Sequence, residues 1–297
     1  MRLTRQQQKL IAASSAIALE RPTDQDKAFL ARQLVQTTLP HTDPGNVPVW
    51  SRTNGNLTLT IQQGYDNKGE PYGHPYGTIP RLLLYWMTTE AIRTKNLRLE
   101  LGNSLAGFME ELGLDSSRGG KRSDAYRLKD QMVRLFEARV SFTTYYEEGG
   151  IIGEERDRIQ IAERSMLWWD HHNPHQRVLW GSYVELNPRF FAAITANPVP
   201  VDLRALQAIR RSPLALDLYS LLTYQAFLAY KSKKPRFMAW KQLQVALGTS
   251  YSDSGDFRWA VKSALAKIVA VYRSLSIGER EGGIEVLPES LPAITER

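Results

Sequence analysis

The chain contains no cysteine among its 297 residues. Disulfides, thiolate nucleophiles and cysteine-based zinc sites are therefore excluded, and a cytoplasmic location is compatible with this composition. No apolar run approaches the roughly 18 residues that would span a bilayer, so no membrane partner is expected. The N-terminal stretch LIAASSAIAL follows three basic residues, as in a signal peptide, but its Ala and Ser content favours an ordinary helix.

Histidine is also scarce, with five in the chain. The single cluster is DHHNPHQ, which holds Asp170, His171, His172 and His175. Adjacent side chains in an extended stretch point to opposite faces, which is poor geometry for a shared metal. We interpret the cluster as a solvated loop. Neither a Ser-His-Asp set nor a Cys-His set is supported, so the sequence predicts a non-enzyme with no metal and no cofactor.

The stretch SSRGGKRSDAYRLKDQMVRLF, residues 116–136, looks in part like a phosphate-binding loop. A P-loop needs G-x-x-x-x-G-K-[ST], in which the hydroxyl residue ligates magnesium. Here Asp115 stands in place of the first glycine and Arg122 in place of the hydroxyl residue. This spelling disfavours an NTPase. Two interpretations stay open: a polar, solvated turn before a helix, and a turn that leads a helix into DNA.

Basic residues exceed acidic ones, giving a net charge of +7 and a pI of about 9.5. They are clustered: the stretch from Lys231 to Lys241 has five basic residues and no acid, and that from Arg118 to Arg139 has seven against three. Such clusters are typical of nucleic-acid-binding domains, although any single run can be a solvated helix face.

Hydrophobic periodicity indicates a recurring order of elements. Residues 1–38 read as one or two polar helices. The later predictions are a strand at 56–62, a loop at 64–77, a helix from 79, a strand at 97–102, a helix at 103–114, a helix at 123–140, a hairpin joining 139–148 to 159–169, and a strand at 177–186. Helix, strand, helix, turn, helix and hairpin is the winged-helix arrangement, in which the third helix reads DNA and the hairpin is the wing.

The same order returns downstream as an internal repeat. Tyr85 aligns with Tyr219 at an offset of 134, and Gly113 with Gly248 at 135, so one insertion suffices. The third helix of the second copy is DSGDFRWAVKSALAKIVAVY, residues 253–272. We therefore predict an α+β, mainly helical fold of two tandem winged-helix domains. The expected divisions are an N-terminal segment at 1–48, a first domain with a long wing at 49–185, and a second domain at 186–297.

Three stretches resemble plasmid-encoded replication initiators of the RepA type. They are YGTIPRLLLYWMTTEAIRTKNLRLELGNSLAGFMEELGL, VELNPRFFAAITANPVPVDLRALQAI and SPLALDLYSLLTYQAFLAYK. The resemblance implies tandem winged helices that bind repeated sites (iterons) in double-stranded plasmid origin DNA, with a host initiator, the replicative helicase and a second copy as partners. Rolling-circle initiators that nick DNA use a His-hydrophobic-His site with a tyrosine, which this sequence does not support. The alternative is a winged-helix transcriptional regulator.

Residues off the core stripe of each third helix, and basic residues in the flanking turns, are the candidate DNA contacts. In the first domain they are Arg118, Lys121, Arg122, Ser123, Tyr126, Arg127, Lys129 and Arg134. In the second they are Lys231, Lys233, Lys234, Arg236, Lys241, Arg258, Lys262 and Lys267. Arg127 is the best candidate for a bidentate guanine contact, and the turn residues for phosphate contacts. The aromatic residues predicted to be core are Tyr85, Trp86, Phe108, Tyr219 and Phe227.

Overall fold

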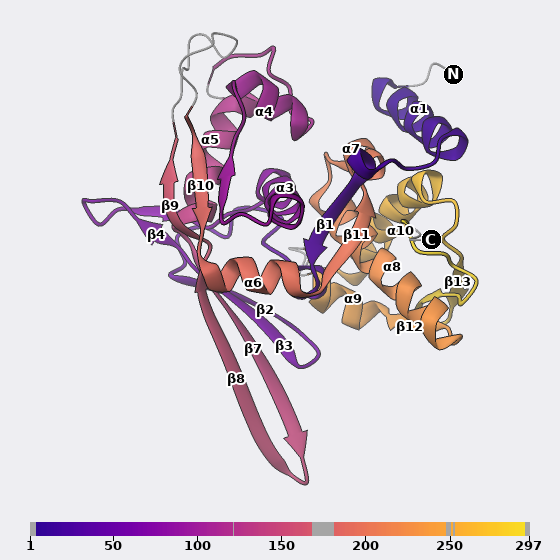
Figure 1. Ribbon diagram of the computed structural model, residues 1–297. Coiled ribbons are helices and arrows are strands. Elements are labelled where there is room, and N and C mark those ends of the chain that lie inside the picture. The colour runs from indigo at the N-terminus through magenta and orange to yellow at the C-terminus, as the bar shows by residue number, and fades with distance from the viewer. Residues whose placement is uncertain (1–3, 121, 168–180, 248–250, 252, 295–297) are drawn as a thin grey trace.

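A computed structural model describes residues 4–120, 122–167, 181–247, 251 and 253–294 (Figure 1). Helices and strands are mixed along the chain, and helices hold fewer than half of the described residues, so the expectation of a mainly helical chain was wrong. The α+β class is confirmed. None of the helices in these ranges is both long and apolar enough to cross a membrane.

The first repeated unit begins with a long buried helix. Its elements are α3 (Thr78–Thr94), β6 (Arg98–Glu100), α4 (Leu105–Glu111), α5 (Asp124–Glu137), β9 (Ala162–Met166) and β10 (Tyr183–Leu186). The three strands form an antiparallel sheet in the order β6-β10-β9. Serines cap the two shorter helices as their positions predict: Ser104 Oγ accepts the N–H of Gly107 at 3.1 Å, and Ser123 Oγ that of Tyr126 at 3.2 Å.

The second unit repeats this order of elements. They are α8 (Pro213–Ser232), β12 (Arg236–Ala239), α9 (Trp240–Leu247), α10 (Ser254–Val271), β13 (Ile277–Arg280) and β14 (Gly283–Val286). Its sheet order, β12-β14-β13, places the first, third and second strands as in the first unit. The long helices also end alike, because Lys95 and Lys233 both adopt the left-handed conformation, with φ of 55° and 57°, three residues before the next strand.

The register of the repeat differs from the single insertion that the sequence suggests. Tyr85 precedes Lys95 by ten residues, whereas Tyr219 precedes Lys233 by fourteen, so α8 is one turn longer than α3 beyond the aligned tyrosine. In compensation α9 begins four residues after the start of β12, whereas α4 begins seven residues after the start of β6. The gain of four residues and the loss of three leave the nearly constant offset that the sequence shows. Gly248 lies outside the described residues.

A second sheet joins four strands in the order β2-β3-β7-β8. They are β2 (Val49–Asn54), β3 (Leu57–Gln62), β7 (Arg139–Glu148) and β8 (Ile151–Gln160). The first wing was expected to join residues 139–148 to 159–169, but β7 pairs with residues 151–160 of β8 on one side and with β3 on the other. The pairing of β7 with β3 buries apolar side chains: Leu59 lies opposite Phe142 and Ile61 opposite Val140, and all four are buried. The strands that pair with β6 are β9 and β10.

The N-terminal segment crosses between the two units. It comprises α1 (Arg5–Leu19), a short 3-10 turn (Asp24–Asp26), β1 (Lys27–Ala31) and α2 (Arg32–Gln36). Its strand β1, in a stretch predicted to be helical, pairs antiparallel with β11 (Pro198–Asp202), and this pair lies between α3 and α8 (Figure 1). The remaining elements are β4 (Gly64–Tyr65), β5 (Pro71–Gly73), α6 (Pro188–Ala196) and α7 (Leu203–Ile209).

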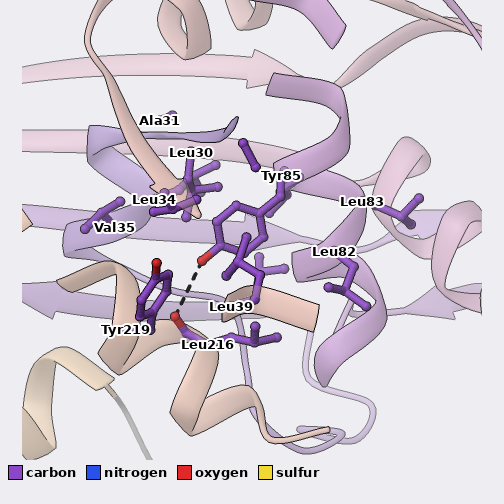
Figure 2. Close-up of a cluster of buried hydrophobic side chains, with 14 of the residues drawn as sticks. Leu30, Ala31, Leu34, Val35, Leu39, Leu82, Leu83, Tyr85, Leu216 and Tyr219 are labelled. Carbon is purple, nitrogen blue, oxygen red and sulfur yellow. Dashed lines mark hydrogen bonds between the residues drawn. The ribbon is translucent and has the colours of Figure 1, made fainter. Parts of the chain in front are cut away.

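The aligned tyrosines of the repeat meet at the joint between the units. Figure 2 shows Tyr85 of α3 reaching toward the backbone carbonyl of Leu216 in α8, at 3.5 Å. The Tyr85 hydroxyl also contacts that of Ser220, and the Tyr219 hydroxyl accepts the N–H of Asp202 at 3.1 Å. Both rings are buried among leucines of α3, β1, α2 and α8 (Figure 2). The joint is therefore part of one continuous core.

A buried ionic cluster lies at the same joint. The Arg81 guanidinium of α3 holds Asp217 of α8 in a bidentate pair, with Nε–Oδ1 at 2.7 Å and the second nitrogen 2.8 Å from Oδ2. His41 Nε2 lies 2.7 Å from the same Oδ2. Arg81 also donates to the carbonyls of Leu39, Pro40 and Gly77. A bidentate pair of this kind is directional, so it fixes how the two long helices meet.

This cluster predicts a pH-dependent stability. Burial lowers the pKa of His41, although its hydrogen bond with Asp217 opposes the shift. Below its ordinary pKa of about 6.5, the unfolded chain binds a proton that folded His41 does not, so stability falls as the pH drops through this range. Above a pH of about 6.5, His41 is neutral in both the folded and the unfolded chain, so it does not make stability depend on pH. Urea midpoints between pH 7.5 and about 5.5 should fall in the wild-type chain and flatten in His41→Gln. An unchanged slope in that variant would assign the effect to other groups.

Candidate nucleic-acid interface

The N-terminal half of α5 presents two of the predicted side chains to solvent. Leu128, Met132 and Leu135 are buried against the unit's core, which turns the opposite face outward. On that face Tyr126 is 46% exposed, and Arg127 is exposed with its guanidinium 3.1 Å from Asp124 Oδ1. A single, partly exposed carboxylate is a weak partner for an arginine, so Arg127 can exchange it for a ligand at little cost.

The turn before α5 carries further exposed cations. Arg118 and Arg122 are both exposed. Arg118 makes one long contact with its local partner, since its Nε lies 3.5 Å from Asp115 Oδ2. Gly120 has φ of +88°, a conformation that other residues rarely adopt, so the second glycine of the GG pair is needed for the turn. Lys121 lies outside the described residues. The glycines thus serve a turn between two helices.

Three predicted residues of this unit are placed differently. Ser123 is 6% exposed and its hydroxyl caps α5, so we remove it from the candidate contacts. Arg134 also leaves them, because its side chain is only 17% exposed, pairs with Asp130 Oδ2 at 3.0 Å and lies over the Tyr76 ring. Lys129 is half-buried and remains a weaker candidate. Sequence alone could not separate these residues, because capping and packing residues share the polar face of the helix.

The N-terminal half of α10 is the counterpart in the second unit. Phe257 and Val261 anchor it in the core, and Arg258, Trp259 and Lys262 are exposed. Trp259 is 75% exposed, the same as Ile151 and less only than Leu19 among the large exposed apolar side chains described. Lys262 pairs with Glu279 of β13 at 3.3 Å, and Lys267 is half-buried. Helix α1 packs at the other end of α10, where Ser14 Oγ donates to the Ala270 carbonyl at 2.5 Å.

A basic run bridges α8 and α9. All five predicted residues are exposed, namely Lys231, Lys233, Lys234, Arg236 and Lys241. Two of them have local contacts: Lys233 Nζ lies 4.0 Å from the Tyr230 ring centre, and Arg236 Nε donates to Gln225 Oε1 at 3.2 Å. The run contains no acid, so its positive charge is available to an anionic ligand.

The structure adds basic residues that pattern reasoning missed. Arg210 follows α7 and packs against Gly113, at the end of α4, where a Cβ on the glycine would lie 3.1 Å from its side chain. Burial lowers the pKa of Arg210, its exposed neighbour Arg211 lowers it further, and Asp124 at the start of α5 opposes both. We therefore add Arg210 and Arg211 to the candidate DNA contacts of the first unit, beside the turn that precedes α5 and the start of that helix. The RR dipeptide was visible in the sequence, but only the tertiary fold places it there.

Four of the five aromatic residues predicted to be core are buried. Phe227 is the exception at 46% exposure, because it lies on the outer face of α8 near the basic run. The histidine cluster at 170–175 lies outside the described residues. Within the part of the chain that the structure describes, no group of three acidic or histidine side chains could hold a metal ion.

Comparison with known proteins places the chain in a family. The crystal structure of RctB domains 2-3 shares 11% identity with it at a TM-score of 0.45, covering 86% of this chain and 94% of that one. A selenomethionine structure of domains 2 and 3 of RctB gives 11% and 0.46, covering 85% and 94%. No curated protein was found to match. The family model described as plasmid-encoded RepA protein matches residues 74–242, which is more than half of the sequence. The chain therefore belongs to the plasmid-encoded RepA protein family.

Proposed function

We propose that this RepA-family chain is a sequence-specific double-stranded DNA-binding protein that initiates plasmid replication in the cytoplasm, without enzymatic activity of its own. The observation that carries the proposal is the repeat: two units of the same element order each expose a cationic N-terminal half of their third helix. That is the end of a recognition helix that meets base edges. The basic turns beside both helices suit phosphate contacts.

In this proposal both units are winged-helix domains. The third helices α5 and α10 are the recognition helices, and the hairpins β9–β10 and β13–β14 are the wings. The strand order shared by the two sheets supports this assignment. Two recognition helices in one chain would enter successive major grooves about 10–10.5 bp apart, so one chain should protect roughly two helical turns of DNA. The sites are expected to be iterons in the plasmid origin, with host initiator, replicative helicase and a second copy as partners.

The decisive experiment separates this proposal from a transcriptional regulator with the same DNA-binding chemistry. The encoding locus is placed on a DNA circle that has no other origin, and transformants are counted. Replication that depends on the intact reading frame is the expected result. A chain that binds the locus and represses its promoter, but never sustains the circle, would be a regulator instead.

Arginines on the recognition helices should read sequence, whereas lysines in the turns should not. We expect Arg127→Ala and Arg258→Ala each to cost about 1–3 kcal/mol of binding and to relax the preference at one base position. Lys234→Ala should weaken all sequences about equally and reduce the salt slope by about one. Lys234 is preferred to Lys233, whose left-handed backbone would strain an alanine. Selection of binding sites with each variant is the measurement. Identical selected sequences for Arg127→Ala and Lys234→Ala would move the recognition helix elsewhere.

Trp259 should read thymine in the second half-site. A large apolar side chain between Arg258 and Lys262 suits the thymine methyl group, the one apolar feature that a base pair offers in the major groove. Replacing the contacted thymine by uracil removes one methyl, so wild-type affinity should fall about fourfold, from roughly 0.8 kcal/mol of lost burial. The same replacement should leave Trp259→Ala unaffected. A uracil scan with no sensitive position in the wild-type complex would place Trp259 outside the groove.

A further inference from the structure

The long hairpin β7–β8 extends well beyond the rest of the molecule (Figure 1). Strand β3 pairs with β7 only as far as Thr144, so the hairpin tip, residues 145–155, has no third strand among the described residues. Gly149 and Gly150 close it with φ of +59° and +81°. Two positive φ values in a two-residue turn match the twist of paired strands, so the tip is a regular hairpin.

The tip exposes an unusual concentration of apolar side chains. Tyr145 and Tyr146 are 40% and 52% exposed, and Ile151 and Ile152 are 75% and 74% exposed. Isolated exposed apolar residues are ordinary, but four within eight residues form a patch that favours contact with another surface. Neighbours along a strand point to opposite faces, so each face of the hairpin carries one tyrosine and one isoleucine. A flat partner would cover only one face, whereas a cleft covers both.

The charge of the tip identifies what kind of surface fits it. Between Tyr145 and Glu155 there are four glutamates and no lysine or arginine, in a chain with a net charge of +7. On one face the Tyr146 hydroxyl donates to Glu155 Oε2 at 2.8 Å. Glu154 pairs with Arg156 just behind the tip, but the remaining carboxylates repel a phosphate backbone, so DNA is disfavoured as the occupant. It complements a basic protein surface.

A second copy of the chain is disfavoured by the residues behind the tip. Residues 154–158 of the edge strand β8 read EERDR. An antiparallel pairing of β8 with its own copy about a twofold axis puts one residue opposite itself. Throughout this stretch that residue would face its own charge, which destabilises a cross-strand pair. Charged edges of this kind prevent sheets from joining, and they leave the tip as the adhesive part of the hairpin.

We propose that the hairpin tip is a docking finger that inserts into an apolar cleft, rimmed by basic side chains, on another protein required for replication. This inference rests on the proposed initiator function, because an initiator must engage other replication proteins once it is on DNA. The finger and the DNA-contacting helices are built from different elements, so the two activities are separable by substitution.

The test uses the full chain and the DNA circle described above. The double variant Ile151→Thr, Ile152→Thr keeps β-branched residues, and thus strand propensity, while removing the apolar contacts. We expect it to lose plasmid replication while its affinity for origin DNA stays within about twofold of wild type, as for other surface substitutions. The matched control is Val49→Thr, which also replaces an exposed β-branched apolar residue by threonine, at a 47% exposed position on the opposite edge strand, β2, of the same sheet. It should replicate normally.

A charge-reversed variant, Glu147→Lys with Glu148→Lys, should also lose replication, because the cleft rim is expected to be basic; normal replication would overturn that chemistry. The inference is overturned if the isoleucine variant replicates like wild type, or if it loses DNA affinity in parallel with replication. Sedimentation that shows a wild-type dimer and a monomeric variant would make the occupant a second copy, against the proposal. If the wild-type chain cannot sustain the circle, the proposed function and this inference fall together.

Discussion

Raising the salt concentration from 50 to 200 mM should weaken DNA binding by about 10³–10⁵-fold, if roughly six to ten cations contact phosphate. The structure leaves enough of them available. Ten of the predicted basic side chains are exposed, namely Arg118, Arg122, Arg127, Lys231, Lys233, Lys234, Arg236, Lys241, Arg258 and Lys262. Each cation that displaces a counterion adds about 0.9 to the slope of log affinity against log salt.

Titrations of origin DNA at several salt concentrations measure this slope. Lys68→Ala is the matched control, since Lys68 is an exposed lysine in the turn between β4 and β5, outside both repeated units. Its slope should equal that of the wild-type chain, whereas Lys234→Ala should lose about one unit. An affinity that hardly changes with salt would remove both basic clusters from the interface and would leave the fold without an assigned DNA-binding surface.

Asp217→Asn should lower the free energy of unfolding by about 3–5 kcal/mol. The Asp217 carboxylate is buried and balances Arg81, whose guanidinium would be left at the joint with a neutral partner. Although burial pushes the pKa of Asp217 upward, Arg81 and the His41 hydrogen bond hold that pKa well below its ordinary range. The carboxylate is therefore ionised in the folded chain. Its contribution to stability is present above the ordinary pKa of about 3.9 and is lost only as the pH falls below it.

Urea unfolding at pH 7 tests this prediction against a matched exposed pair. Arg98 and Glu100 are also 2.7 Å apart, but both side chains are at least half exposed. Glu100→Gln should therefore cost at most about 1 kcal/mol. Equal losses for the two variants would mean that the buried pair is no more important than a surface one. A smaller loss for Asp217→Asn would show that water reaches the joint.

The sequence predicted those parts of the fold that local chemistry decides. The helices α3, α4, α5, α8 and α10 were expected from their apolar stripes. Strand β1 was missed because its KAFLA sequence has no clear alternation, and it becomes a strand only by pairing with β11. The partner of the long hairpin was missed for the same reason, since β3 and β7 are more than seventy residues apart.

The candidate interface shows the same division. Cationic residues in turns were readily predicted, because turns are exposed. Residues on the polar side of a helix were not, because Arg134 packs on Tyr76 while Arg127, one heptad earlier, does not. The buried joint between Arg81 and Asp217 was invisible to pattern reasoning. A charged residue within an apolar helix has no detectable partner until the two helices are brought together.

The pairing of β1 with β11 also delays part of folding during synthesis, because the two strands are far apart in the sequence. Residues 27–31 emerge from the ribosome early, but their partner strand, residues 198–202, is made about 170 residues later. At about 5–20 residues per second, this interval is roughly 10–30 s. Throughout it, the backbone edge of β1 that pairs with β11 stays uncovered. Nascent chains stalled before β11 should thus depend on chaperones, whereas those stalled beyond it can pair the two strands.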